Sequence, residues 1–417
     1  MDIYDVIVVG AGPAGILAAG SAAKLGAKVL ILEKMSSVGR KLLITGKGRC
    51  NVTNGASASD FLSHVYPDSR FLRPALSEFN SNDIIQLLDN HGVQVVEGPN
   101  NRYFPASDKA ADVLKALLNW VNNFPIDLKV NSRVTKIVVE DGTVKGAEFN
   151  GQVFPTNAVI IATGGKSYPA TGSTGDGYEL ARQLGHSIVK PIPALVPLET
   201  KGSVVRQLQG LNLTDIKAIA WVNNRKVWET RGEMIFTHFG LSGPAILTLS
   251  RFVVNPLQNG DLVKITIDFF PDSDDQSLDK KLQNDINTHG RKKIINMLHL
   301  WLPASLVPVF MAKLELDDTK EAHQITGKER KNIVGLLKSF PLEISHNRSF
   351  KDAIITAGGV STKEINQKTM ESKLVRGLFF AGEIIDIDAD TGGYNLQIAY
   401  STGWLAGLKA AKARISE

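Results

Sequence analysis

The chain has 417 residues, 43% of them hydrophobic, which is enough to bury a large core in two or three structural units. It contains no run of about 18 uncharged apolar residues, so we expect no membrane span. The net charge of +5 comes with basic residues spread along the chain, which argues against a nucleic-acid partner. The N-terminus lacks a basic leader before an apolar core, and the single Cys50 excludes an internal disulfide. These features predict a cytoplasmic protein.

The start of the chain carries a dinucleotide-binding pattern. An apolar strand leads into the sequence G-x-G-x-x-G formed by Gly10, Gly12 and Gly15, and a helix follows. Gly10 permits a tight turn, Gly12 lets the backbone approach a pyrophosphate, and Gly15 allows the helix to pack closely on the strand. A second apolar strand ends at Glu33, at the spacing where an acid binds a ribose hydroxyl.

The next segment, residues 34–54, is rich in glycine, basic residues and hydroxyl groups. Its glycines allow close backbone approach, and Arg40, Lys41 and Arg49 can offset phosphate charge. The glycine pattern by itself does not distinguish NAD from FAD. This segment favours an extended cofactor that has phosphates and a polar ring edge.

The rest of the first domain alternates between helices and strands. Apolar spacing predicts a helix that begins at Ser81 and another over 108–122. We expect strands over 93–96 and 159–162 and a hairpin over 134–149. The alternation is typical of an α/β fold with a mostly parallel sheet.

The composition changes after this first domain, which we place at 1–190. Strand-like runs predict a β-rich insertion over 191–270, which would form a substrate domain. Residues 271–345 are expected to form a small helical cap, in which Thr326 begins a helix with a capping box. The first domain then resumes over 346–417.

The C-terminal part contains a second glycine-rich turn. A strand ends at Gly382 and Glu383, and the pair Gly392 and Gly393 precedes a helix that begins at about Leu396. Taken alone, the pair is equally compatible with a plain helix-start turn. Beside a bound cofactor, a helix N-terminus there would stabilise negative charge.

Four segments make the chain resemble the bacterial NAD(P)/FAD-dependent oxidoreductase family that includes aminoacetone oxidases and 3-dehydro-bile-acid reductases. They are residues 10–33, 39–54, 162–165 and 381–397. The flavin domain is similar to that of fumarate reductase and succinate dehydrogenase flavoproteins. The resemblance covers essentially the whole chain. It implies an α/β fold with a three-layer, Rossmann-like FAD-binding domain that the β-rich insertion and the helical cap interrupt.

The glycine pattern and the resemblance together imply a set of FAD-binding residues. In related flavoproteins, the segment matching Gly382 and Glu383 lies near the ribityl chain or the pyrophosphate. The segment matching Gly393, Asn395 and Leu396 offers backbone N–H groups near the flavin ring. The complete expected set is Gly10, Gly12, Pro13, Ala14, Gly15, Glu33, Lys34, Gly39, Arg40, Lys41, Thr45, Gly46, Gly48, Arg49, Cys50, Asn51, Val134, Thr163, Gly164, Gly165, Gly382, Glu383, Gly393, Asn395, Leu396 and Gln397.

Two residues are candidates for proton transfer in catalysis. His238 lies in a loop-like run, Thr-His-Phe-Gly-Leu-Ser-Gly-Pro, and the resemblance places that run over the flavin. Tyr168 follows a strand-end turn and could reach flavin or substrate. Each residue also has a plain alternative role, as a structural histidine and as a half-exposed loop aromatic.

Thiol and metal chemistry receive little support. Cys50 has no second cysteine with which to cycle through a disulfide, although the neighbouring Arg49 could lower its pKa. The histidines show no zinc-like spacing, so we expect no metal site.

The favoured function is hydride transfer from NADH or NADPH through FAD to an unsaturated or carbonyl-conjugated small molecule. The nicotinamide would act as a transient co-substrate, because the chain has no second complete G-x-G-x-x-G pattern. One alternative is a flavin-dependent amine or aminoketone oxidase that produces peroxide. Another is a flavin-binding regulatory or RNA-linked protein. The choice of nucleotide and the oligomeric state stay open.

Overall fold

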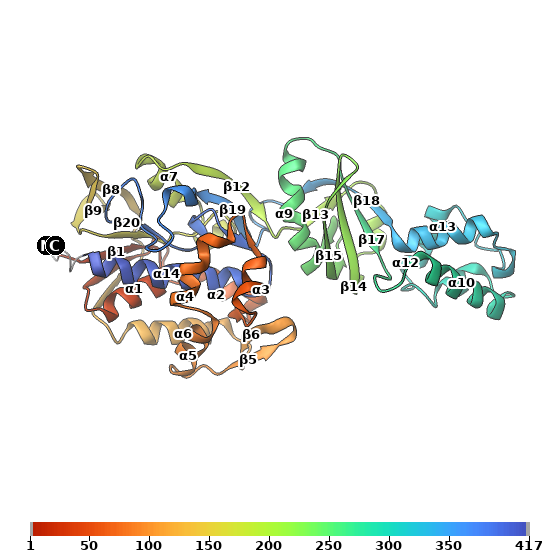
Figure 1. Ribbon diagram of the computed structural model, residues 1–417, viewed down its shortest axis with the longest axis horizontal. Helices are drawn as coiled ribbons and strands as arrows, with labels where there is room; N and C mark the ends of the chain where they lie inside the picture. Colours follow the sequence, from red (N-terminus) through yellow and green to blue (C-terminus); the bar gives the residue numbers. More distant parts are fainter. Residues whose placement is uncertain (1–2, 414–417) are drawn as a thin grey trace. The chain divides into compact units, whose positions relative to one another are not determined.

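The computed structural model describes residues 3–413 and divides into two compact units (Figure 1). Unit 1 comprises Met1–Pro193 and Ala353–Glu417, and unit 2 comprises Ala194–Asp352. The ends of the predicted first domain, residues 1–2 and 414–417, lie outside the described residues. Among residues 3–413, no helix is both long and apolar enough to cross a membrane.

Unit 1 is built around a five-stranded parallel sheet in the order β20-β11-β1-β2-β7. Its first four strands in that order are short apolar runs that are buried throughout, as expected for a parallel sheet covered on both faces. The strands are β1 (Val6–Val9), β2 (Val29–Leu32), β7 (Ile126–Lys129), β11 (Val159–Ile161) and β20 (Leu378–Phe380). Parallel pairing brings the segments that follow β1, β2, β11 and β20 to one edge of the sheet.

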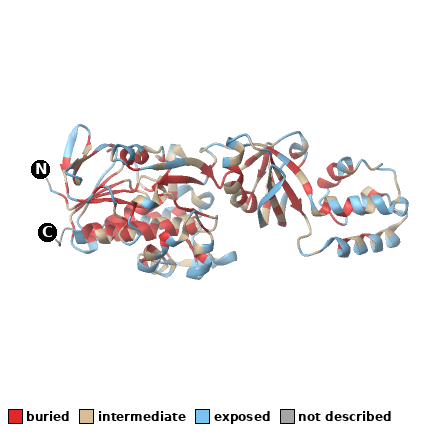
Figure 2. Ribbon diagram, turned by 45° about the horizontal axis from the view of Figure 1, so that its top comes forward, coloured by how far each residue is buried: buried red, intermediate tan, exposed pale blue. Residues whose placement is uncertain are grey.

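Two helices far apart in sequence pack tightly on this sheet. Helices α1 (Pro13–Lys24) and α14 (Tyr394–Ala413) lie side by side and are buried along most of their length (Figure 2). A Cβ on Gly403 would lie 2.2 Å from the Ala14 carbonyl oxygen, and one on Gly407 would lie 2.1 Å from that of Ala18. The close approach therefore requires glycine on α14.

The remaining elements of unit 1 form smaller sheets and covering helices. The hairpin β8–β9 gains a third strand, β10, in the order β10-β9-β8. The remaining helices are α2 (Arg40–Ile44), α3 (Ala58–Ser63), α4 (Arg73–Glu78), α5 (Ser81–Asp89), α6 (Ala110–Val121) and α7 (Asp176–Gln183). The remaining strands are β3 (Thr53–Asn54), β4 (Val65–Tyr66), β5 (Val95–Gly98), β6 (Arg102–Pro105), β8 (Val134–Glu140), β9 (Thr143–Phe149), β10 (Gln152–Pro155), β12 (Ile188–Ala194), β19 (Ile355–Val360) and β21 (Asp388–Ala389).

Unit 2 contains a closed barrel with strand order β13-β16-β15-β14-β17-β18 and several helices. Alternating residues such as Ile216, Ala218 and Ala220 are buried, which is the period-two pattern of a barrel strand. The strands are β13 (Leu198–Thr200), β14 (Asn212–Val222), β15 (Arg225–Phe236), β16 (Gly240–Ser242), β17 (Val263–Asp268) and β18 (Phe340–Asn347). The helices are α8 (Val204–Gln207), α9 (Pro244–Gln258), α10 (Asp275–His289), α11 (Ile294–Leu298), α12 (Leu306–Leu314) and α13 (Gly327–Lys338).

The fold class is confirmed, whereas three local predictions differ from the structure. The end of the segment expected to be helical, 271–345, contains strand β18, because Phe340, Leu342 and Ile344 alternate toward the barrel interior. The β-rich segment 191–270 includes the 15-residue helix α9. The last helix begins at Tyr394, two residues before the expected start.

Candidate functional site

The glycine turn after β1 is closed on one side and open on the other. Gly10 has a φ of +103°, and a Cβ there would lie 2.6 Å from the Ala162 carbonyl oxygen. A Cβ on Gly15 would lie 1.9 Å from the Gly10 carbonyl oxygen, so neither position admits a side chain. A Cβ on Gly12 would meet nothing within 4 Å. Gly12 therefore borders open space at the N-terminus of α1, where Pro13 is the first helical residue and a pyrophosphate would meet the positive helix end.

The carboxylate of Glu33 is fixed against this turn. Its Oε2 accepts a hydrogen bond from the N–H of Ala11 at 2.9 Å, and its Oε1 accepts one from the N–H of Met35 at 2.8 Å. A carboxylate offers about four acceptor sites, so both oxygens keep capacity for a ribose hydroxyl.

The predicted phosphate-binding segment is tied down by contacts within unit 1. Gly39 has a φ of +64° directly before α2. Lys34 pairs with Asp176 at 3.1 Å, and Arg40 donates a hydrogen bond to the Ala170 carbonyl at 3.3 Å. These cations therefore hold the segment in place, and only what remains of their hydrogen-bonding capacity is left for a phosphate.

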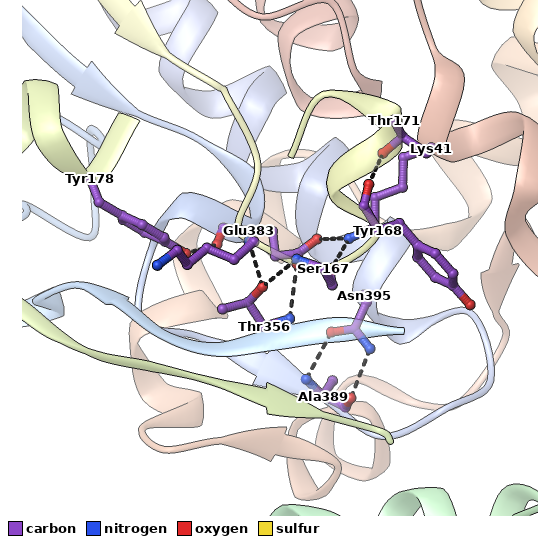
Figure 3. A network of polar contacts seen from close by, with 10 residues as sticks. Lys41, Ser167, Tyr168, Thr171, Tyr178, Thr356, Glu383, Ala389 and Asn395 are labelled. Carbon is purple, nitrogen blue, oxygen red and sulfur yellow. Dashed lines mark hydrogen bonds and ion pairs between the residues drawn. The ribbon is translucent and has the colours of Figure 1, made fainter. Parts of the chain in front are cut away.

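Glu383 joins four parts of unit 1 (Figure 3). It lies in the 3₁₀ turn η7 (Gly382–Ile384). Its Oε1 accepts hydrogen bonds from the Ser167 hydroxyl at 2.7 Å and from the N–H of Thr356 at 2.9 Å. Its Oε2 pairs with the ammonium of Lys41, which also donates to the Ser167 hydroxyl at 2.6 Å. One carboxylate thus connects η7 with α2, β19 and the loop after β11.

Both glycines expected near the flavin lie at close approaches. A Cβ on Gly382 would lie 2.8 Å from the Cβ of Ala14, at the start of α1. A Cβ on Gly393 would lie 2.4 Å from the Thr53 carbonyl, so the turn before α14 packs directly on β3. The structure brings the C-terminal turn and the N-terminal turn together around the starts of two helices.

The first turn of α14 is rigidly held. The Asn395 side chain accepts from the N–H of Ala389 at 2.9 Å and donates to the carbonyl of Ala389 at 2.7 Å (Figure 3). The wholly buried Gln397 accepts a hydrogen bond from the Thr53 hydroxyl at 2.7 Å and donates to the Phe79 carbonyl at 3.2 Å. Leu396 lies between these two anchors. The Gln397 side chain is committed to the core, and its N–H donates to the Gly393 carbonyl at 3.1 Å.

Two buried polar atoms in the predicted cofactor segments have no partner. They are Oδ1 of Asn51 and Oγ1 of Thr163. Thr163 precedes Gly164, which has a φ of +74°, and Gly165, where a Cβ would lie 2.4 Å from the Thr356 hydroxyl oxygen. Buried polar atoms are normally hydrogen-bonded. Unpartnered atoms at both positions fit a polar cofactor that supplies the missing hydrogen bonds.

Cys50 lies in the core. Its side chain is wholly buried, and its N–H donates to the Thr45 carbonyl at 3.1 Å in the η1 turn (Thr45–Gly48), where Gly46 and Gly48 have positive φ. Burial raises the pKa of the Cys50 thiol to about 11. The expectation that Arg49 could lower this pKa is therefore wrong. The Arg49 guanidinium instead lies 5.1 Å from the centre of the Phe104 ring.

We expect Cys50→Ser to retain full turnover and to lower the free energy of unfolding by about 1–3 kcal/mol, because it places a hydroxyl in an apolar site. Steady-state kinetics and urea denaturation measure the two effects. In parallel, a thiol-alkylating reagent should leave the native wild-type protein unmodified. A large loss of turnover in a stably folded Cys50→Ser protein would show that the thiol takes part in catalysis.

The two candidate catalytic residues belong to different units. Tyr168 has a φ of +51°, a strained value for a non-glycine residue, and its carbonyl accepts from the Thr171 hydroxyl at 2.7 Å (Figure 3). His238 is exposed in the tight turn between β15 and β16, and the centre of its ring lies 5.0 Å from that of Phe239.

Val134, which was expected to contact the cofactor, is buried at the start of β8.

Sequence reasoning missed a group of polar residues around Gly392. The Asn54 side chain donates to the Gly392 carbonyl at 3.0 Å, and Nε of Arg102 would lie 3.6 Å from a Cβ on Gly392. Arg102 has no carboxylate partner among residues 3–413. His64 and Asp390 form an ion pair beside the same turn. His64 and Arg102 lie outside the four predicted segments, whereas Asn54 and Asp390 lie within segments 39–54 and 381–397 but were given no role. The pairing of short strands brings these residues together.

The residues present fit an FAD. They provide an open glycine turn, a carboxylate at the position expected for a ribose contact, two unpartnered buried polar atoms and a helix N-terminus. The N–H groups of the first three residues of α14 lack partners within the helix and could receive negative charge, whereas the N–H of Gln397 donates to the Gly393 carbonyl. Among residues 3–413, no cluster of histidine, cysteine and acidic side chains could hold a metal ion.

Comparisons with known proteins agree with this site. The model of the HI0933-like protein Rossmann domain matches residues 4–409. The chain is 32% identical to the 3-dehydro-bile acid delta(4,6)-reductase of Clostridium scindens, covering 97% of this chain and 98% of that protein. It is 31% identical to the ribosomal RNA dihydrouridine synthase of Escherichia coli, covering 97% of each. A quinol-fumarate reductase structure shares the fold, with a TM-score of 0.52 and 19% identity over 99% of this chain and 72% of that chain.

Proposed function

We propose a reaction for this chain, which belongs to the HI0933-like Rossmann-domain family. The reaction is the FAD-dependent transfer of a hydride from NADH or NADPH to a carbon–carbon double bond that is conjugated to a carbonyl group. The substrate is a small molecule that carries such a bond. The proposal favours a reductase over an amine or aminoketone oxidase and over a non-catalytic flavin-binding protein.

One feature shared by the two full-length relatives supports the proposed reaction. The name of the Clostridium scindens protein describes reduction at the delta(4,6) positions of a 3-dehydro-bile acid. The name of the Escherichia coli protein describes conversion of uridine into dihydrouridine. In both compounds the reduced double bond is conjugated to a carbonyl, which makes one of its carbons electrophilic. This common chemistry carries the proposal.

The residues of unit 1 provide the electrostatic setting for this reaction. When bound, FAD supplies a group that accepts and donates a hydride. The N-terminus of α14 and the unpaired Arg102 place positive charge at the Gly392–Gly393 turn. Positive charge there would stabilise negative charge on a bound flavin or on the carbonyl oxygen of a conjugated substrate.

Anaerobic mixing with NADH and with NADPH tests the proposal. We expect one nucleotide to bleach the flavin absorbance rapidly, and a conjugated enone to restore it without oxygen. Absence of bleaching by either nucleotide would contradict the proposal and favour an oxidase that takes electrons from an organic substrate. Restoration by oxygen with peroxide formation, and by no enone, would favour the oxidase as well.

A second candidate substrate is uridine within RNA, and a group of exposed cations in unit 2 favours it. Arg291, Lys292 and Lys293 are consecutive and exposed, and none forms an ion pair with a carboxylate among residues 3–413. Such a run offers phosphate contacts that weaken as salt rises. Salt-dependent retention of RNA together with loss of uridine from that RNA would support this candidate. No RNA retention at low salt would exclude it.

A further inference from the structure

We propose that His64, held by Asp390, is the proton donor of this enzyme. The assignment rests on the proposed reductase function and names the residue that completes the reaction. Nothing in the glycine motifs points to it. The assignment rests on three observations: the pairing of two short strands, a stacked aromatic ring and a buried carboxylate oxygen without a partner.

The backbone brings the two residues together. Strand β4 pairs antiparallel with β21, with Val65 opposite Ala389. His64 therefore precedes one strand at the point where Asp390 follows the other, and the N–H of Asp390 donates to the His64 carbonyl at 3.1 Å. The Asn395 side chain also donates to the Asp390 carbonyl at 3.1 Å. The pair is thus fixed to the turn that leads into α14.

The side chains form an oriented pair. Nδ1 of His64 lies 2.8 Å from Oδ2 of Asp390, and the imidazole stacks on the Tyr394 ring with centroids 4.7 Å apart and planes 23° apart. Oδ1 of Asp390 is buried without a partner. Nε2 of His64 makes no hydrogen bond within residues 3–413, and the Asp60 carboxylate lies 3.9 Å from it. Nδ1 of the imidazole is therefore held by Asp390, while Nε2 makes no hydrogen bond to the described residues and lies only within ion-pair distance of the Asp60 carboxylate.

The surrounding charges favour the protonated imidazole. The groups that face His64 are Asp390, Asp60 on α3, and Tyr394 on α14. The hydrogen bond that the imidazolium donates to Asp390 raises the pKa of His64, burial opposes this, and the charges of Asp390 and Asp60 add to the increase. His64 thus stays charged above its ordinary pKa of about 6.5. The stability that the pair adds is complete below that value and is lost as the pH rises through the folded-state pKa.

The proposed step balances in atoms and electrons. Reduction of the conjugated double bond needs a hydride at one carbon, which bound FAD would supply, and a proton at the other. The proton comes from Nε2 of the His64 imidazolium, which becomes neutral and regains a proton from water. NADH or NADPH returns the electron pair. Asp390 is a positioning residue that orients the ring and keeps it charged.

The test compares His64→Gln and Asp390→Asn with His91→Gln. His91 is also in unit 1, and its Nδ1 lies 2.7 Å from a backbone carbonyl oxygen, that of Leu87. We expect His64→Gln to slow reoxidation of the reduced enzyme by 2-cyclohexenone about 100-fold, while flavin reduction by nucleotide keeps its rate. In wild-type protein the reoxidation rate should fall as the pH rises through the pKa of His64. The His91→Gln protein should match wild type in both half-reactions.

A second readout does not depend on turnover. The imidazole NMR signal that disappears in His64→Gln should titrate above pH 6.5 in wild-type protein and close to about 6.5 in Asp390→Asn. Wild-type reoxidation rates and pH profile in His64→Gln would overturn the assignment and leave the proposed function intact. Failure of the wild-type enzyme to react with any conjugated acceptor would remove the proposed function and the role of His64 with it.

Discussion

Gly12→Ala is expected to weaken FAD binding about 10- to 100-fold while the apoprotein keeps its stability to within about 1 kcal/mol. Gly12 has a φ of −83°, which alanine adopts without strain. A methyl group there would meet no protein atom within 4 Å, so it can obstruct only a ligand that needs the space. Titration of the apoprotein with FAD measures the affinity, and urea denaturation measures the stability.

Two other glycines make this experiment specific. Gly335 is exposed in α13, and a Cβ there would also meet nothing, so Gly335→Ala should leave FAD affinity unchanged and add about 0.5–1 kcal/mol of stability. Gly15→Ala should damage the fold itself, because its Cβ would lie 1.9 Å from a backbone oxygen. Wild-type FAD affinity in Gly12→Ala would show that the pyrophosphate does not use the open side of the turn.

The dinucleotide-binding part of the site could be predicted because its signals are local. Gly10, Gly12, Gly15 and Glu33 lie within one β–α–β unit, in which apolar runs and glycine spacing each have a single structural explanation. The same reasoning predicted the α/β fold and the resemblance to FAD-dependent oxidoreductases, both of which are confirmed.

The polar side of the site could not be predicted because it depends on contacts distant in sequence. His64 and Asp390 are 326 residues apart and meet through strands of two residues each, which leave almost no pattern in a sequence. The barrel has the same difficulty. Strand β18 pairs with β17, for example Phe340 with Ile267, across the helices α10 to α13, so its apolar alternation follows a helical segment directly in the sequence.

Glu383→Ala is expected to lower the free energy of unfolding of unit 1 by about 2–3 kcal/mol and to weaken FAD retention. The variant leaves the Lys41 ammonium, only 22% exposed, without its carboxylate. It also leaves the N–H of Thr356 without its acceptor. Breaking a fully buried pair costs about 3–5 kcal/mol, and partial solvent access reduces that value. Denaturant unfolding of the apoprotein measures the loss.

The loss of unfolding free energy from Glu383→Ala, compared between wild type and Lys41→Met, separates the ion pair with Lys41 from the other hydrogen bonds of Glu383. In Lys41→Met protein, Glu383→Ala should cost less than in wild type, because no ammonium is left unpaired. Glu179→Ala removes an exposed carboxylate paired with Arg182 on α7 and should cost less than about 1 kcal/mol. Equal losses from Glu383→Ala in the two backgrounds would mean that Glu383 acts through the Ser167 and Thr356 hydrogen bonds alone. A smaller loss in Lys41→Met, accompanied by weaker FAD retention in both, would show that one ion pair holds α2 and η7 in place beside the cofactor.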